Sequence, residues 1–266
     1  MATPPKPGFD HQRWIIPLAL FIVVIALWEI WVRVAQIPHY ILPTPSRVAA
    51  TLIADWPVLF SSLLVTLSTT LQGLALALIG GVGLAILFTQ SRLIENALYP
   101  YAVILQVTPV IAIAPLLLIY MPQPAAVLTC AWLVAFFPIL TNTTQGLKSA
   151  DHNLQDLFDL YGASGWQKLW HLKLKAALPY FLTGLKIGGV LSLIGAVVAE
   201  IAAGSAGAGS GLAYRIVESQ YRLNIARLFA ALTLLSVTGI VLFLFLSWFS
   251  NRLLASWHES AREREV

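Results

Sequence analysis

The sequence has little charge and almost no cysteine. Only 11% of its 266 residues are Asp, Glu, Lys or Arg, whereas soluble domains carry about 25%, so the charges are too few to cover a water-soluble surface. The single cysteine, Cys130, excludes a disulfide within the chain and a cysteine metal site. The formal charge of +4 is modest, and no basic stripe with interleaved aromatic residues predicts nucleic-acid binding.

Motifs for nucleotide binding and catalysis are also missing. The sequence has no G-x-x-x-x-G-K-[ST] phosphate loop, because the glycines between residues 204 and 211 are not followed by lysine. The five histidines form no H-E-x-x-H motif, and no G-x-S-x-G motif is present. The sequence therefore predicts no catalytic residue, no metal site and no cofactor. A pump built on this chain would need an ATPase on a separate polypeptide.

Long apolar runs are abundant. Uncharged stretches cover residues 56–91, 96–147 and 228–251. Because one helical crossing needs about 20 apolar residues, each stretch can span a bilayer, and the longest can do so twice. Prolines at 121–124 lie near the middle of that longest stretch and end one helix before the next. The apolar stretch from residue 14 to 32 is long for a signal peptide and predicts an uncleaved signal anchor.

These runs predict an all-α, polytopic membrane protein with about six transmembrane helices. The spans are placed at residues 14–34, 62–89, 97–120, 125–145, 178–203 and 226–254. Cytoplasmic loops carry an excess of Lys and Arg, and both termini are predicted to be cytoplasmic because the inner segments then hold twice as many of them as the outer segments. The inner set is Lys6, Arg13, Arg92, Lys148, Lys168, Lys173, Lys175, Arg252, Arg262 and Arg264, and the outer set is Arg33, Arg47, Arg215, Arg222 and Arg227.

This topology divides the chain into four parts. Residues 1–13 and 255–266 are predicted cytoplasmic tails, and residues 14–61 hold the first helix and an extracytoplasmic segment. Residues 62–254 form the transmembrane core, which contains one long cytoplasmic loop at residues 146–177. On the outer side, the glycine-rich segment that begins at residue 204 is expected to be flexible or tightly turned.

The cytoplasmic loop predicts two short amphipathic helices that meet at Gly162. Glycine is favoured after a helix C-terminus, and Ser164 with Gln167 forms a capping-box pattern that begins the second helix. On pattern alone, the pair fits both an interfacial element on lipid headgroups and a docking element for a partner. The apolar residues at helical spacing are Leu154, Leu157, Phe158 and Tyr161 in the first helix, and Trp166, Leu169 and Trp170 on one side of the second.

The loop resembles the "EAA" loop of ABC importer permeases, which has the form E-A-A, three residues, G, nine residues, I-x-L-P. Aligned on Gly162, the acidic position falls on Asp156 and the two alanines on Leu157 and Phe158. The loop departs from the pattern because Phe158 is far larger than alanine and Lys175 stands at the proline position. The resemblance implies that the elbow inserts into a cleft on an ATPase subunit, through the coupling residues Asp156, Leu157, Phe158, Gly162, Ala163, Ser164 and Trp166.

Five further motifs stand in the order seen in the nitrate, taurine and sulfonate group of these permeases. That group includes relatives for bicarbonate, riboflavin and pyrimidine vitamin precursors, and the resemblance covers nearly the whole chain after residue 40. It implies a type I ABC importer-like fold, a permease homodimer in membrane lipid, a separate ATP-binding subunit that is itself a dimer, and an extracytoplasmic solute-binding protein. The motifs lie at residues 41–46, 109–116, 184–186, 198–200 and 211–212.

Small residues repeat every four positions in two predicted spans, which lets helices approach closely. Packing within one subunit fits this pattern, and so does a dimer interface or a wall of the translocation path. The residues are Gly73, Ala77 and Gly81 in the second span, and Gly184, Gly188, Ser192 and Ala196 in the fifth.

Three residues are candidates for the translocation path. Glu200 lies near the outer end of the fifth span, where a charge is costly and often functional. It either lines or gates the path, or anchors the glycine-rich segment. Thr108 and Pro109 begin a proline-containing segment, and such segments can break a helix where its backbone lines a cavity.

An ion-gradient-driven secondary transporter is the main alternative function. Such a transporter would need internal repeats with paired broken helices and ionisable groups near the membrane midplane, and the sequence shows no convincing repeat. A membrane enzyme is disfavoured because no catalytic constellation is present. The identity of the solute is not encoded in any motif of the chain.

Overall fold

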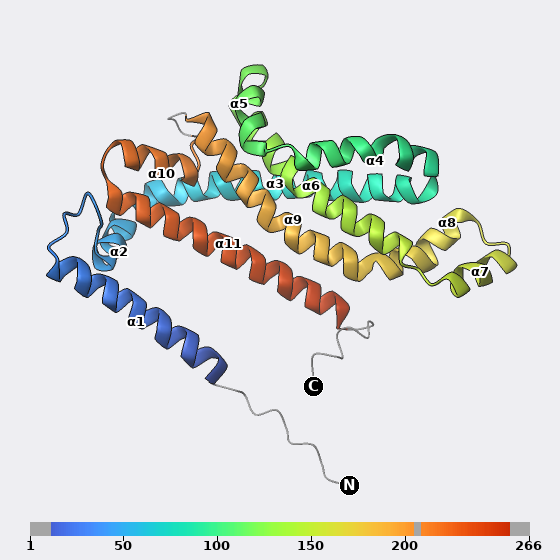
Figure 1. Cartoon of the computed structure of the whole chain (residues 1–266), viewed down its shortest axis with the longest axis horizontal. Helices are drawn as coiled ribbons and strands as arrows, with labels where there is room; N and C mark the ends of the chain where they lie inside the picture. Colours follow the sequence, from blue (N-terminus) through green and yellow to red (C-terminus); the bar gives the residue numbers. More distant parts are fainter. Residues whose placement is uncertain (1–11, 205–208, 256–266) are drawn as a thin grey trace, which may run out of the picture.

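The structure is a computed structural model that describes residues 12–204 and 209–255 as a helical bundle (Figure 1). The predicted tails lie almost entirely outside these ranges, as do Gly207, Arg262 and Arg264. The elements in chain order are α1 (Gln12–Val34), α2 (Pro45–Ala54), α3 (Trp56–Gln90), α4 (Arg92–Val107), α5 (Val110–Tyr120), α6 (Gln123–Lys148), α7 (His152–Leu160), α8 (Gly165–Lys168), η1 (Leu169–Lys173), α9 (Leu174–Ala203), α10 (Leu212–Tyr221) and α11 (Ile225–Leu254).

The described residues contain six membrane spans if the bent pair α4–α5 counts as one. The five single spans are helices long and apolar enough to cross a bilayer. The third span, predicted over residues 97–120, is the pair α4 and α5, which are bent by 100° at a break. The break falls at Thr108 and Pro109, whose backbones are extended, because a proline disfavours helical conformation in the residue before it.

The core is formed where α6 and α9 pack along one another, with α3 against both (Figure 1). The predicted small residues make this close approach possible. A Cβ at Gly184 would lie 2.8 Å from the carbonyl oxygen of Pro138, and one at Gly73 would lie 2.8 Å from the Cβ of Ala131. Ser192 Oγ also donates a 2.9 Å hydrogen bond from α9 to a carbonyl of α3. The small-residue stripes therefore serve packing within the subunit.

The predicted glycine-rich segment lies partly outside the described residues, and the helix α10, which was not predicted from the sequence, follows it. Gly204 ends α9 in the left-handed region, with φ of +55°, and α10 then packs against α9, α11 and α3. Leu212 and Ala213 are fully buried at its first turn. Burial of this apolar turn holds α10 against the bundle.

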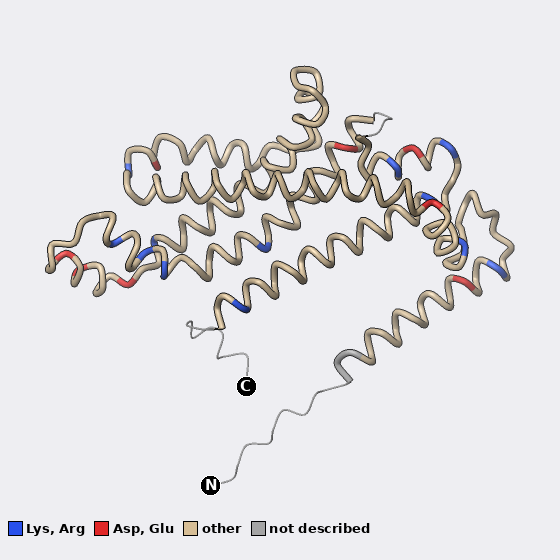
Figure 2. The backbone as a smooth tube through the Cα atoms, turned by 180° about the vertical axis from the view of Figure 1, so that it is seen from behind, with Lys and Arg blue, Asp and Glu red and all other residues tan. Residues whose placement is uncertain are grey.

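The first helix, α1, diverges from the rest of the bundle (Figure 1). It is attached near its C-terminal end. There Glu29 Oε2 accepts a 3.0 Å hydrogen bond from Ser46 N, and the ring centroids of Trp28 and Phe229 are 5.6 Å apart. Most of its other described side chains are exposed apolar residues. Figure 2 shows that charged residues gather towards the two ends of the long helices, as expected for helices that cross a bilayer.

Candidate functional site

The elbow at Gly162 has the geometry that its sequence predicts. Gly162 has φ of +66°, which costs glycine little and other residues more. Its N–H donates to Asp159 O at 2.9 Å, and Ala163 N–H donates to Phe158 O at 2.9 Å. These two bonds form a Schellman motif, which satisfies the last carbonyls of α7 and fixes the direction of the chain after it.

The second arm of the elbow begins with the predicted capping box. Gln167 N donates to Ser164 Oγ at 3.3 Å, and Ser164 N donates to Gln167 Oε1 at 2.7 Å. This arm is not a separate helix as predicted, because α8 runs through the π-helical turn η1 directly into α9. Lys168 of this arm pairs with Asp159 of α7, so the two arms are tied together.

The prediction that Trp166, Leu169 and Trp170 share one side is wrong for Leu169. Leu169 is 1% exposed and packs in a core cluster with Phe88 and Leu147, whereas the two tryptophans are 64% and 63% exposed. Leu169 begins the π-helical turn that joins α8 to α9, and it faces the core at this junction.

A groove of about 420 Å³ lies between the two arms of the elbow. Of the predicted coupling residues, Leu157, Phe158 and Ala163 line it. Asp156 is exposed beside it, Gly162 and Ser164 shape the turn, and Trp166 lies outside it. Tyr161, which the sequence places on the same helical face as Leu157 and Phe158, also lines the groove, and sequence reasoning missed the other two lining residues, Gln167 and His171.

A second site lies towards the end of the molecule opposite the elbow, where Glu200 is 4% exposed. Thr66 Oγ1 donates to Glu200 Oε1 at 2.8 Å and accepts a 2.9 Å bond from Leu212 N. Ala213 N donates to Glu200 Oε2 at 3.1 Å. The carboxylate and the hydroxyl thus satisfy two N–H groups of the first turn of α10, where negative charge is stabilised by the helix dipole.

Gly211 is required for this arrangement. A Cβ at that position would collide with the Glu200 carboxylate, so only glycine lets the backbone approach it. Further along α10, Glu218 pairs with Arg215 at 2.8 Å and with Arg222 at 2.9 Å. The hydrogen bond from Arg215 lowers the pKa of Glu218 below its ordinary value. The helix is therefore held by a carboxylate at its start and by ion pairs at its end.

Glu200 also borders a cavity of about 150 Å³ between α3, α6, α9 and α10, together with Thr69, Gln123 and Tyr214. Glu200 therefore anchors α10 and also faces a cavity, and its role in the translocation path stays a prediction. Sequence reasoning missed Thr66. The available signal was a polar residue at every fourth position of an apolar helix, since Ser62, Thr66 and Thr70 are all buried on α3.

The other two candidates for the translocation path, Thr108 and Pro109, do not line the cavity beside Glu200. They form the break between α4 and α5, and Thr108 Oγ1 donates to Ile104 O at 2.7 Å. A polar groove of about 500 Å³ lies instead along the C-terminal part of α6, lined by Thr141, Thr144 and Tyr180 among others. The Thr144 hydroxyl is buried there without a hydrogen-bond partner. The signal that sequence reasoning missed was the run of five polar residues at 141–145.

Comparisons with known proteins give a consistent result. The family described as "binding-protein-dependent transport system inner membrane component" matches residues 77–255, more than half of the chain. A "probable ABC transporter permease protein" of Haemophilus influenzae is 32% identical over 92% of this chain and 98% of its own. The "formylaminopyrimidine transport permease protein ThiX" of Halalkalibacterium halodurans is 34% identical, covering 90% and 94% of the two chains.

Two further matches extend the comparison. The "riboflavin transport system permease protein RibX" of Chloroflexus aurantiacus is 33% identical over 95% of this chain and 93% of its own. A solved structure titled "crystal structure of an amino acid ABC transporter with histidines" superposes with a TM-score of 0.64 at 17% identity. It covers 76% of this chain and 97% of that one, so the two share a fold.

Proposed function

The chain belongs to the family of binding-protein-dependent transport system inner membrane components, and we propose that its elbow couples it to a separate ATPase subunit that drives solute import. As a multi-pass ABC permease, the chain provides the membrane passage. The observation that carries the proposal is the groove between α7 and α8, which is lined largely by apolar side chains yet left open. ATP hydrolysis is assigned to the partner, because the sequence has no phosphate loop.

The structure offers a route from the elbow to the outer site. The second arm, η1 and α9 are one continuous helical segment, Gly165–Ala203. The elbow lies at one end of this segment and Glu200 close to the other. Two α7 residues, Leu157 and Phe158, and Ala163 at the start of the second arm are the side chains that we expect to contact the ATPase. Asp156, Gly162, Ser164 and Trp166 are expected to shape or border that contact.

A second permease copy is part of the proposal. The α4–α5 break at Thr108 and Pro109 leaves non-helical backbone on the surface of the bundle. Such backbone is tolerated at membrane depth only where protein covers it or where it lines a water-filled cavity. A homodimer that faces this break would cover part of the exposed backbone with protein and would enclose a water-filled passage beside it. The polar groove on α6 would open towards the same passage.

The orientation and the cargo complete the proposal. Both termini are assigned to the cytoplasm, which places the elbow inside and α2 and α10 on the side that receives a solute-binding protein. The solute belongs to the nitrate, sulfonate, taurine, bicarbonate or vitamin-precursor type. Because the named cargoes of two similar permeases are formylaminopyrimidine and riboflavin, heterocyclic vitamin precursors are the first to test. The ion-gradient alternative has no observation in its favour.

The decisive experiment replaces Gly162. Valine is strained at φ of +66°, so Gly162→Val should deform the elbow and abolish both uptake and co-purification of the ATPase, while the amount of membrane-inserted permease stays near that of the wild type. Gly83→Val is the matched control, because Gly83 is exposed on α3 and its Cβ would meet nothing within 4 Å. ATP-coupled uptake that persists in Gly162→Val would contradict the docking assignment.

A further inference from the structure

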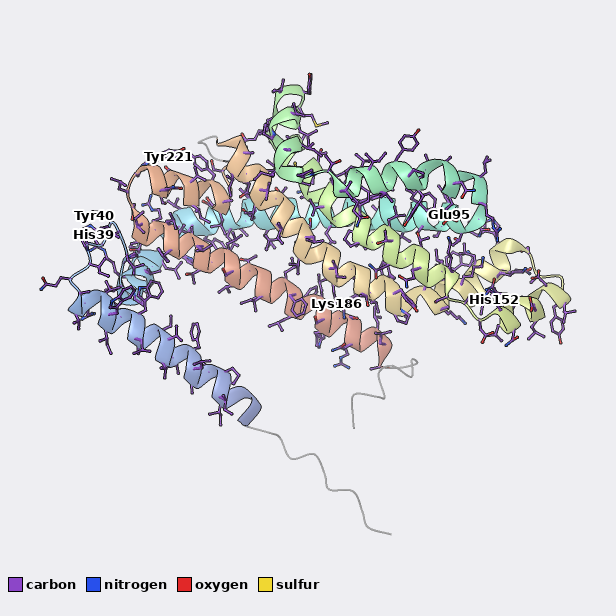
Figure 3. All side chains as sticks on the ribbon, viewed as in Figure 1. His39, Tyr40, Glu95, His152, Lys186 and Tyr221 are labelled. Carbon is purple, nitrogen blue, oxygen red and sulfur yellow. The ribbon has the colours of Figure 1, made fainter. Side chains whose placement is uncertain are left out.

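A basic pocket lies behind the elbow, on the side of the transmembrane core. It has a volume of about 580 Å³, and its lining comes from α3, α4, α6, α7 and η1. The positively charged side chains in it are Arg92 at the start of α4, Lys148 at the end of α6 and Lys173 in η1. Figure 3 places Glu95 and His152, which also line the pocket, at the same end of the molecule.

The charges in this pocket do not balance. Its single carboxylate, Glu95, is already paired with Lys148. Arg92 and Lys173 form no ion pair with any residue in the ranges that the structure describes. Two positive charges therefore face the cavity without a counter-charge, and a cleft lined by charge of one sign attracts ions of the other sign.

The usual excess of Lys and Arg beside a membrane does not by itself explain this arrangement. That excess requires only that the residues lie near the same side of the bilayer. Here they come from three segments far apart in the sequence and converge on one cavity. Lys175 shows the contrast, because it is exposed only two residues after Lys173 and does not line the pocket.

We propose that this pocket binds a phosphate group, carried by an anionic phospholipid or by a soluble phosphate, and that the bound group ties the elbow to the transmembrane core. The Arg92 guanidinium is suited to two parallel hydrogen bonds with phosphate oxygens, and Lys173 adds a point charge. The anion would bridge α7 and η1 to α3, α4 and α6. The inference rests on the proposed function only for the role of the elbow, since the binding itself requires no transport.

The test uses the purified full-length permease in lipid nanodiscs. Its thermal unfolding is followed by tryptophan fluorescence in three settings: phosphatidylcholine alone, phosphatidylcholine with phosphatidylglycerol, and phosphatidylcholine with inorganic phosphate against chloride at equal ionic strength. An anion present at about ten times its Kd should raise the Tm by about 3 °C. The double variant Arg92→Gln/Lys173→Gln should lose this rise, and the control Lys175→Gln should keep it.

Each outcome decides the matter. A rise with phosphatidylglycerol alone identifies a lipid headgroup, and a rise with inorganic phosphate identifies a soluble anion. No rise in the wild type, or an equal rise in the double variant, overturns the proposal. If the double variant loses ATPase co-purification while the wild type shows no anion-dependent rise in Tm, the proposal is also overturned. The pocket then binds an acidic surface of a partner protein.

Two further variants keep the test decisive if the double variant does not fold or if the proposed function fails. If the double variant does not fold, Lys173→Gln alone must show a reduced rise, or the proposal fails. Gly162→Val, which tests the proposed function, should leave the anion-dependent rise unchanged, so that the two proposals can fail separately.

Discussion

The elbow and the Glu200 site lie towards opposite ends of one helical segment and are built in opposite ways. The elbow is exposed, its groove is largely apolar, and its turn is held by hydrogen bonds between residues at most five positions apart. The Glu200 site is buried and polar, and its central bond joins residues 134 positions apart. The first is suited to contact with a partner, and the second to holding three helices of the chain together.

Replacing Glu200 should produce the largest effect on stability. Glu200→Ala removes the acceptor for Thr66 and for Ala213 N, and buried donors left without a partner cost about 1–3 kcal/mol each. We therefore expect about 3 kcal/mol of lost stability, measured as a lower Tm of the purified permease. Glu200→Gln keeps one acceptor oxygen and should cost less.

Glu200→Gln also tests whether the Glu200 site has a role in transport beyond stability. Glu200→Gln should lower uptake more than it lowers the amount of membrane-inserted protein, because Glu200 also borders a cavity. An equal loss of uptake and of inserted protein would show that the outer site serves only as an anchor.

Replacing Leu157 should have the reverse profile. Leu157→Asp places a charge in the elbow groove, and we expect the affinity for the ATPase to fall at least about tenfold, as for a moderate interface hot spot. Stability should change by no more than about 0.5 kcal/mol, since the residue is exposed. Quantitative pull-down and thermal unfolding on the same preparations test both expectations.

Leu160→Asp is the matched control for this variant. Leu160 lies on the same helix and is exposed, but it does not line the groove. If both variants weaken ATPase binding equally, the groove has no special role. If neither does, the elbow contacts its partner through another face.

The smallest effect is expected from Ser164→Ala, which removes the capping hydroxyl of the second arm. Loss of an N-cap side chain costs about 1 kcal/mol. The first turn of α8 should therefore exchange its amide hydrogens about fivefold faster, while exchange in the first turn of α10 stays the same. Equal acceleration at both ends would mean that the two sites are not independent.

Local geometry accounts for what could be predicted from the sequence. The glycine at 162 and the Ser164–Gln167 capping box are recognisable because all their partners lie within a few residues. The break at Pro109 is recognisable for the same reason, although the 100° angle is not. The partnership of Thr66 with Glu200 depends on how α3, α9 and α10 pack, and no local pattern records that.

Contacts with distant segments explain a second kind of failure. Leu169 was predicted to share one side with Trp166 and Trp170, and it packs instead in the core with Phe88 and Leu147. The helix α10 was missed because the glycines before it dominated the local composition. In both cases the local sequence pattern was interpreted correctly, but burial against segments distant in the sequence decided the structure.

The length of α9 has a mechanical consequence. Its 30 residues, at 1.5 Å per residue, span about 45 Å, which is roughly the thickness of a bilayer with its headgroups. A tilt of about 5° displaces one end of such a helix by about 4 Å relative to the other, by simple trigonometry on that length. A shift of that size at Glu200 relative to α3 would exceed the reach of its hydrogen bond to Thr66, so we expect a small rocking motion of α9 to release the start of α10.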